Sequence, residues 1–221
     1  MELKCETYLK TYKVIIMLQT DLTKEFSKFE AGYRNRKGIA VLQTKPSGVT
    51  DILSVYNYIT SDAPKPVTLQ LRSMIGKKSD SEISEFKKLN FKIVCVRGVF
   101  LKRCAEGLAT PSYYLPIDID DLASAEEARE VQQIIINDPH LEVALSFTSP
   151  SGFGAKIFIE IPEWAADLGY RQQYDFIAAH IGIAHGILLD RSGSDVARAA
   201  FLGWDPQAYI NPKYLINNSK F

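Results

Sequence analysis

Two aspartates at the end of one apolar run have the type and spacing to bind a metal ion. The run YYLPIDIDD, residues 113–121, places Asp118 and Asp120 two positions apart. Because side chains alternate along a strand, both carboxylates would lie on one face, about 7 Å apart. Two like charges at that separation repel each other unless a cation lies between them. The pattern therefore indicates a metal site, and a helix N-cap followed by a turn is the alternative that stays open.

A third carboxylate, Asp190, ends a second apolar run, ILLD, at residues 187–190. If this run forms a strand beside the first one, its carboxylate can share a metal with Asp118 and Asp120. Three carboxylates around Mg²⁺ or Mn²⁺ suit phosphoryl transfer, because the metal lowers the pKa of an attacking hydroxyl and neutralises a leaving pyrophosphate. These aspartates are the candidate catalytic and metal-binding residues.

A turn rich in small residues, SPSGFGAK at 149–156, has the composition of an anion-binding loop. Its glycines allow backbone N–H groups to converge on a phosphate, its serines add hydroxyl donors, and its lysine adds a positive charge. An ordinary hairpin turn is the alternative, because Ser-Gly and Pro-Ser are common turn pairs. The candidate nucleotide-binding residues of this stretch are Ser149, Ser151, Gly152, Gly154 and Lys156.

Arg198 follows in the stretch DRSGSDVARAAF, residues 190–201. A guanidinium there can bind a phosphate through two parallel hydrogen bonds, or it can form a structural ion pair with Asp195 or Asp205. The structural role is slightly favoured, and both readings stay open.

Two histidines, His180 and His185, lie five residues apart in a segment with helical character. Five residues along a helix rotate two side chains well away from one face. We therefore expect separate core or surface histidines, and no zinc-binding pair.

The second half of the chain reads as an α+β domain with the order β-α-β-β-α-β. Ser124 and Glu127 have the spacing of a capping box at the start of its first helix. This order is the split unit of RNA-recognition-motif and ferredoxin-like folds, an antiparallel sheet with both helices on one face and the other face free for a site. The expected elements are a strand at 113–118, a helix at 124–136, strands at 141–148 and 155–161, a helix at 170–186 and a strand at 187–190.

The first half is harder to read. Apolar composition predicts strands at 11–20 and 52–59. A helix is expected at 21–32, because Asp21 lies near its start and Gly32 near its end. Helices are expected after the prolines of 61–80 and from Ser81 onward, followed by extended chain with a turn at Gly98. The division that follows is an N-terminal extension at 1–50, an N-terminal α/β module at 51–110 and the palm-like unit at 111–221.

The net charge is zero, but it is unevenly distributed. Residues 1–110 hold 19 Lys/Arg and 11 Asp/Glu, a net charge of +8, and residues 111–221 hold 7 and 15, a net charge of −8. This asymmetry favours a basic surface for a polyanion, although solvated faces can also differ by chance. No apolar run approaches the roughly 18 residues that span a bilayer, so we expect a cytoplasmic protein with no membrane contact. The three cysteines lack metal-ligand spacing and read as free thiols.

Three blocks, LPIDID, SPSGFGAK and ILLD, resemble in their order the archaeo-eukaryotic primase (primase–polymerase) superfamily. That pattern is a hydrophobic strand ending in Asp-x-Asp, a small-residue turn leading to a basic residue, and a hydrophobic strand ending in Asp. The resemblance is closest to the primase-like domain at the N-terminus of Bacteroides mobile-element proteins, often labelled a VirE N-terminal domain. It runs from roughly residue 52 to 212 and includes NDPHLEVALSFTSPSGFGAKIFI and DRSGSDVARAAFLGWDP.

The resemblance implies a metal-dependent nucleotidyltransferase acting in the DNA replication of a mobile element or phage. Asp118, Asp120 and Asp190 would bind Mg²⁺ or Mn²⁺, and the turn with Lys156 would bind the triphosphate. The implied partners are nucleoside triphosphates, single-stranded or primed DNA, and a possible helicase, for which the chain itself has no Walker-type motif.

One departure is Lys156, because the superfamily usually has His at this position; Lys still offers a positive charge to phosphate, so the departure argues against efficient synthesis more than against nucleotide binding. A catalytically inactive nucleic-acid-binding module is therefore the alternative, and a nucleotide cyclase fits the motifs less well.

Overall fold

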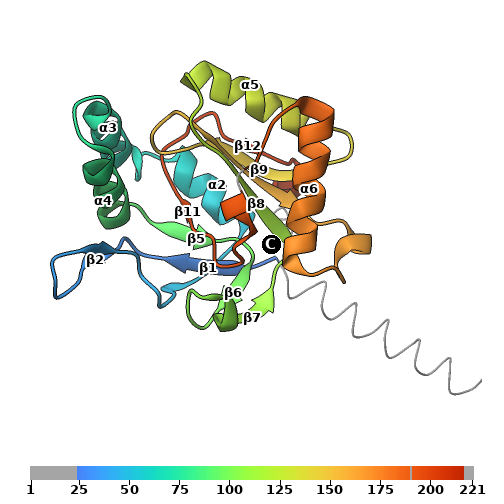
Figure 1. Cartoon of the computed structure of the whole chain (residues 1–221), viewed down its shortest axis with the longest axis horizontal. Coiled ribbons are helices and arrows are strands. Elements are labelled where there is room, and N and C mark those ends of the chain that lie inside the picture. Colours follow the sequence, from blue (N-terminus) through green and yellow to red (C-terminus); the bar gives the residue numbers. More distant parts are fainter. Residues whose placement is uncertain (1–23, 190, 217–221) are drawn as a thin grey trace, which may run out of the picture.

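The computed structural model describes residues 24–189 and 191–216, in which short strands and helices alternate (Figure 1). The strands are β1 (Phe26–Phe29), β2 (Tyr33–Arg34), β3 (Ala40–Val41), β4 (Gly48–Thr50), β5 (Ile93–Cys95), β6 (Gly98–Phe100), β7 (Leu108–Pro111), β8 (Tyr114–Ile119), β9 (Glu142–Thr148), β10 (Ala155–Glu160), β11 (Ala200–Phe201) and β12 (Tyr209–Ile210). The α-helices are α2 (Ile52–Thr60), α3 (Lys65–Met74), α4 (Asp80–Asn90), α5 (Ala125–Ile136), α6 (Tyr170–His185) and α7 (Lys213–Ile216). Single 3₁₀ turns are η1 (Ala105–Gly107), η2 (Glu163–Ala165) and η3 (Arg191–Ser194).

Of the two four-stranded sheets, the one with the longer strands, here called the large sheet, is antiparallel and has the strand order β12-β9-β10-β8. One face of this sheet carries the alternating apolar residues of β8 and β10, including Ile117 and Ile157. The helices α5 and α6 pack on this same face through Val131, Ile135 and Ile177, among others. The α+β class with antiparallel sheets is therefore confirmed, and β8, α5, β9, β10 and α6 follow one another along the chain.

The opposite face of the sheet is also buried, so the expectation that it would be free for a site is wrong over most of its area. Phe158 of β10 lies edge-to-face against Phe26 of β1 and Phe147 of β9, with ring centroids 6.5 Å and 5.6 Å away. Ile52 and Ile59 of α2 join the same apolar cluster. One core thus joins the N-terminal strands to the large sheet.

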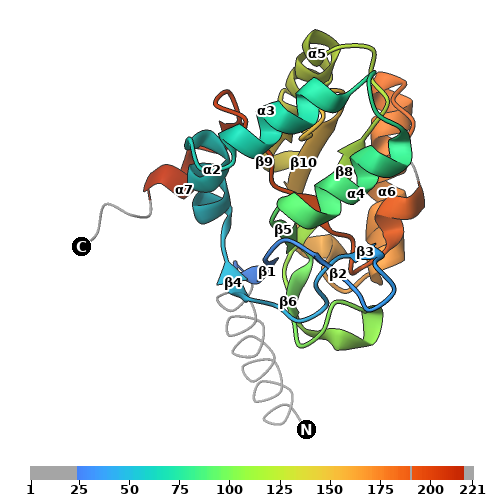
Figure 2. The same ribbon diagram turned by 90° about the vertical axis from the view of Figure 1, so that its left-hand side faces the viewer.

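Three strands of the N-terminal half and β11 of the C-terminal half form a second antiparallel sheet in the order β11-β5-β1-β4. The helices α3 and α4 pack against each other, and α4 packs on the short β2–β3 hairpin. Figure 2 shows the two helices in front of β8, β9 and β10. Helix α4 begins at a capping box in which Ser79 and Glu82 exchange hydrogen bonds, so its cap lies two residues before the expected Ser81.

Residues 52–59 form helix α2, and the expected strand there is wrong. The buried residues Ile52, Val55 and Ile59 follow a helical period, and Asp51 caps the helix by accepting a hydrogen bond from the Ser54 N–H. The segment is rich in β-branched and aromatic residues, and these suggested a strand although the spacing of its apolar residues is helical.

The helix expected at 21–32 is also wrong, because Phe26–Phe29 form strand β1 between β4 and β5. Phe26 and Phe29 are completely buried, one in each of two apolar clusters. Tertiary contacts on both sides of this short strand therefore override its local helical character.

The strand expected at 187–190 is not present in residues 187–189, although Ile187 and Leu189 pack against the helix-covered apolar cluster. As a result β8 is an edge strand of the described sheet, and no strand from residues 187–189 lies beside it. Asp190 and the strand predicted at 11–20 lie outside the described residues.

Within the described ranges, no helix combines the length and the apolar composition that crossing a bilayer requires.

Phe158→Ala tests whether the shared aromatic core joins the two sheets. Removing this fully buried ring should lower the free energy of unfolding by about 3–5 kcal/mol, since a cavity replaces a side chain packed on both sides. Urea unfolding monitored by circular dichroism measures the change. Phe153→Ala is the matched control, because that ring is 40% exposed and its loss should change the free energy by less than about 0.5 kcal/mol. Equal losses in the two variants would contradict this assignment of the core.

Candidate functional site

Asp118 lies at the centre of a charged cluster at one end of the large sheet. Strands β8 and β10 pair so that Asp118 and Lys156 are direct cross-strand partners. Both side chains are more than nine-tenths buried, and Lys156 Nζ lies 2.6 Å from Asp118 Oδ1. Arg198 Nε donates to the other oxygen, Oδ2, at 3.1 Å. Three of the residues singled out in the sequence therefore meet, although 80 positions separate the outermost two.

The two cations determine the charge of Asp118. Burial by itself raises the pKa of this carboxyl group, but the charges and hydrogen bonds of Lys156 and then Arg198 outweigh burial and leave the pKa below its ordinary value. Asp118 is therefore a carboxylate at neutral pH, as a metal ligand or a partner of cations must be.

Asp120 lies just beyond the end of β8 and is exposed. It is two residues after Asp118, so its side chain leaves the backbone on the same side. A Cβ atom on Gly154 would lie 3.2 Å from Asp120 Oδ1 and only 2.7 Å from the Ile119 carbonyl oxygen. Gly154 is thus required for the close approach of the hairpin to the end of β8. The chain then turns at Asp121, whose φ of 58° is in the left-handed region that aspartate tolerates better than most residues.

The hairpin between β9 and β10 contains the predicted phosphate-binding residues. Its own hydrogen bonds use two of the N–H groups, because Ser149 donates to the Gly154 carbonyl and Gly152 donates to the Ser149 carbonyl. The hydroxyl groups of Ser149 and Ser151 lie 2.9 Å apart. Gly152 has a φ of 93°, which favours glycine. The hairpin is therefore an ordered turn whose hydroxyls, more than its N–H groups, are suited to contact an anion.

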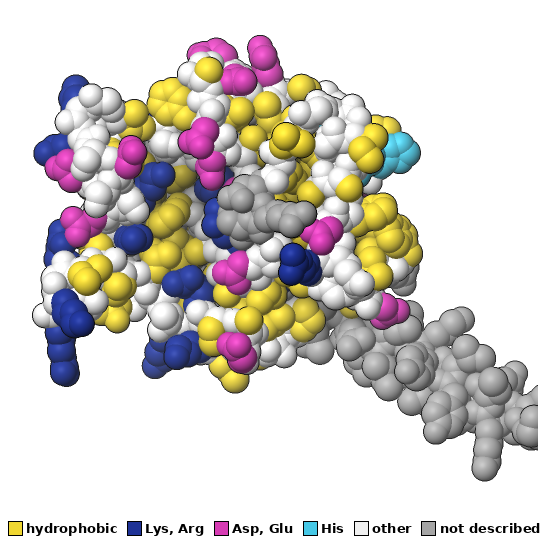
Figure 3. All heavy atoms as spheres, viewed as in Figure 1, with side chains coloured by type: hydrophobic (Ala, Val, Ile, Leu, Met, Phe, Trp, Pro, Cys, Tyr) yellow, Lys and Arg dark blue, Asp and Glu magenta, His cyan; other side chains and the backbone are white. Residues whose placement is uncertain are grey.

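Two further cations beside this cluster were not identified from the sequence. Lys87 on α4 has its pKa lowered by burial and then by the charge of Lys156, while Asp120 and Asp121 act in the opposite direction. Arg72 on α3 donates from Nε to the Pro150 carbonyl at 3.2 Å. Nothing in the local sequence marks either residue, because the packing of α3 and α4 beside the sheet brings them here. Figure 3 shows Lys and Arg side chains around the hollow between these helices and the sheet.

A cavity of about 820 Å³ adjoins the hairpin. Ser151 and Phe153 of the hairpin, Arg72 of α3, Arg129 of α5 and Trp204 contribute to its wall. This volume lies in the usual range for small-molecule sites, and the combination of arginines with the exposed ring of Phe153 and the half-buried ring of Trp204 suits an anionic ligand with a flat apolar part.

The loop that carries Trp204 is held by a buried carboxylate, Asp205. Asp205 forms an ion pair with Arg129 and accepts hydrogen bonds from the N–H groups of Thr148 and Gln207. The N–H of Trp204 donates to the Thr68 hydroxyl at 2.9 Å. Asp205 therefore pairs with Arg129 and does not pair with Arg198, which corrects one of the structural roles considered for Arg198.

Asp195 accepts a hydrogen bond at its backbone carbonyl from the Arg198 N–H. The Arg198 side chain contacts Asp118, so the second structural partner considered for the guanidinium is not the one observed.

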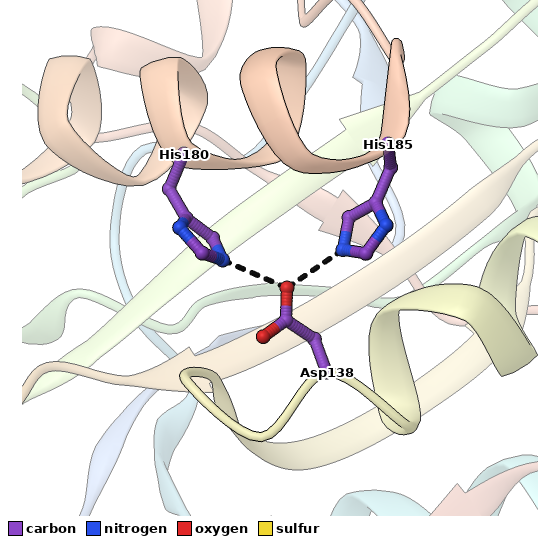
Figure 4. Close-up of side chains that lie close together, drawn as sticks. All are labelled: Asp138, His180 and His185. Atoms are coloured by element: carbon purple, nitrogen blue, oxygen red, sulfur yellow. Dashed lines mark hydrogen bonds and ion pairs between the residues drawn. The ribbon is translucent and has the colours of Figure 1, made fainter.

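The predicted separation of His180 and His185 is wrong, because both contact Asp138 (Figure 4). They lie on α6, whereas Asp138 follows α5, so only the fold reveals that they converge.

Residues 86–210 match the family model described as BT4734-like, N-terminal domain. The matched span contains Asp118, Asp120, the hairpin with Lys156, and Arg198. No curated protein and no solved structure matches the chain.

Asp118→Asn tests the charged cluster through the pH dependence of stability. Since the pKa of Asp118 in the folded chain lies below the ordinary 3.8, its ionised form stabilises the fold above about pH 4, and this contribution is lost as the pH falls through the folded-state pKa. The variant should lose about 3 kcal/mol at pH 7, because Lys156 stays buried without a charged partner. Urea unfolding of wild type and variant between pH 7 and pH 3 should show that the gap between their free energies of unfolding narrows at the acid end. A gap that stays constant over this range would contradict the assigned role.

Proposed function

This chain belongs to the BT4734-like, N-terminal domain family, and from that starting point we propose that it is a metal-dependent nucleotidyltransferase of the primase–polymerase type. It would extend or initiate a strand on single-stranded or primed DNA during replication of a mobile element or phage. The observation that carries the proposal is the meeting of Asp118, Lys156 and Arg198 beside the exposed Asp120 and the serine–glycine hairpin.

The carboxylates fit a hard divalent cation in their chemistry. Mg²⁺ and Mn²⁺ prefer carboxylate oxygens, and the exposed Asp120 offers such oxygens to solvent. Asp118 is different, since both of its oxygens already contact cations. To act as a ligand, it must give up Lys156, Arg198 or both. A bound divalent cation would supply a lower pKa for an attacking hydroxyl and charge neutralisation on a leaving pyrophosphate.

An incoming triphosphate offers the two cations a replacement for Asp118. The side chains of Lys156 and Arg198 are 8% and 33% exposed, so both charges are largely shielded from water and need a strong anionic partner. If they transfer from the carboxylate to phosphate oxygens, Asp118 becomes available to the metal at the moment the nucleotide arrives. Arg198 can bind phosphate with two donors, and Lys156 acts as a point charge.

The remaining roles follow from position. The hydroxyls of Ser149 and Ser151 can donate to the phosphates, and Gly152 and Gly154 keep the hairpin close to β8. The adjoining cavity, with the partly exposed Phe153 in its wall, can take the base, because aromatic side chains stack on bases with little regard to sequence. A helicase partner belongs to the same proposal.

A nucleic-acid-binding module without catalysis is the second candidate, and one observation favours it. The paired state of Asp118 is stable in its own right, and Lys156 stands where the primase–polymerase superfamily usually has a histidine. In such a module Lys87, Arg72 and Arg198 would contact backbone phosphates while no metal is held.

Asp120→Asn tests catalysis with little risk to the fold, because Asp120 is exposed. Wild type should extend a primer on single-stranded DNA with Mg²⁺ or Mn²⁺, and the variant should be slower by about 10²-fold, a loss typical of removing one electrostatic contact to a transition state. Asp175→Asn is the matched control, since this exposed aspartate on α6 has only a 4.0 Å contact with Arg171. Equal activity in Asp120→Asn and wild type would reject the nucleotidyltransferase proposal.

Salt dependence tests the binding module. Affinity for single-stranded DNA should fall steeply with salt, and Lys87→Ala should reduce the slope of log K against log salt by about 0.7, the change expected for one lost phosphate contact. Arg171→Ala removes an exposed cation from α6 and should leave the slope unchanged. Fluorescence anisotropy between about 50 and 200 mM salt measures both, and affinity that does not respond to salt would count against phosphate contacts altogether.

A further inference from the structure

All three histidines of the chain gather around one buried carboxylate, at the point where the ends of α5 and α6 meet (Figure 4). Asp138 follows Asn137, the residue that caps the C-terminus of α5, and His185 is the last residue of α6. The cluster is on the helix-covered side of the large sheet, whereas Asp118 and Lys156 are on the other side. It therefore forms no part of the proposed nucleotide site.

We propose that Asp138, His180 and His185 form a binding site for a divalent transition metal of the zinc class. The Nε2 atoms of His180 and His185 lie 2.7 Å and 2.6 Å from the same oxygen, Asp138 Oδ2. The three ligand atoms all lie within 4.8 Å of one another. In a tetrahedral zinc site, neighbouring ligand atoms are about 3.3 Å apart, so a movement of about 0.6 Å opens the space for an ion.

The donor set selects the class of metal. Two imidazole nitrogens and one carboxylate oxygen suit Zn²⁺ and its neighbours among the transition metals, whereas Mg²⁺ and Ca²⁺ prefer oxygen ligands alone. Three protein ligands leave the fourth tetrahedral position for a water molecule. The side chains of His180 and His185 are 25% and 20% exposed, which gives an ion access from solvent.

The surroundings hold the carboxylate in place for this role. Asp138 has a 2% exposed side chain, and its second oxygen, Oδ1, accepts a hydrogen bond from the His140 N–H at 2.8 Å. Burial raises the pKa of Asp138, but the hydrogen bonds from His140, His185 and His180 lower it to about 2, so the ligand is already ionised. A hydrogen bond to the non-ligating oxygen is the contact that orients ligands in metal sites.

The five-residue spacing of the histidines, which argues against a pair on one helical face, is compatible with this geometry. The two side chains flank Asp138 from either side, as Figure 4 shows, and the carboxylate lies between them. A metal there would fasten the turn between α5 and β9 to the last turn of α6.

Substitution by glutamine separates metal binding from hydrogen bonding. His180→Gln and His185→Gln keep an N–H donor of similar length for Asp138 but remove the imidazole ligand. Tag-free full-length protein, stripped of metal with a chelator, is titrated with Zn²⁺ by calorimetry and heated with and without Zn²⁺. Wild type should bind one Zn²⁺ and melt at a higher temperature with it, and each variant should bind at least about 10-fold more weakly.

His140→Ala and Cys104→Ser are the matched controls, because each removes a potential zinc ligand that is outside the proposed set. The Zn²⁺ affinity of both variants should lie within about 3-fold of the wild-type affinity, a much smaller change than the loss expected on removing a metal ligand. The proposal is overturned if wild type binds no Zn²⁺, if the glutamine variants bind as wild type does, or if either control loses as much affinity as His185→Gln.

Discussion

A carboxylate held between two cations in a nearly dry environment is the interaction on which this end of the molecule depends. Asp118 belongs to a sheet whose buried residues are mostly apolar, so its charge is stable there only with Lys156 and Arg198 in contact. Lys156 comes from the neighbouring strand and Arg198 from the segment before β11. One buried charge therefore fastens three parts of the chain together.

The strand register explains why this cluster forms at all. Side chains alternate along β8 and β10, and Ile117 and Ile157 point to the helices while Asp118 and Lys156 point to the opposite face. A slip of one residue in either strand would bury a charge beneath the helices, at a cost of several kcal/mol. The need to bury the apolar face therefore fixes the strand register, and the register in turn places Asp118 opposite Lys156. The same constraint keeps Asp120 on the side of the hairpin glycines.

Much of the second half was predictable from the sequence, because its elements carry strong local signals. The strand expected at 155–161 is β10, and Ser124 starts α5 by accepting the Glu127 N–H as expected. The reciprocal half of the expected capping box is not formed, because the Glu127 carboxylate accepts the N–H of Ala123. Helix α2 was missed because β-branched and aromatic residues concealed a helical period, and β1 was missed because a four-residue strand carries little periodicity. Lys87, Arg72 and the pairing of the histidines depend on tertiary packing between distant segments, and no pattern in one sequence reports such contacts.

The loop that carries Trp204 has a consequence for how a ligand would be received. Its backbone is tied to Thr68 by Trp204, to Ile59 by Asp205, and to α5 through the ion pair of Asp205 with Arg129. A wall held in this way is preorganised, so it adds little ordering entropy to the cost of binding. It is equally unsuited to swing open and shut as a gate. Discrimination between ligands at this cavity would then come from fit against a rigid surface, and release of a bound ligand would not wait for this segment to move.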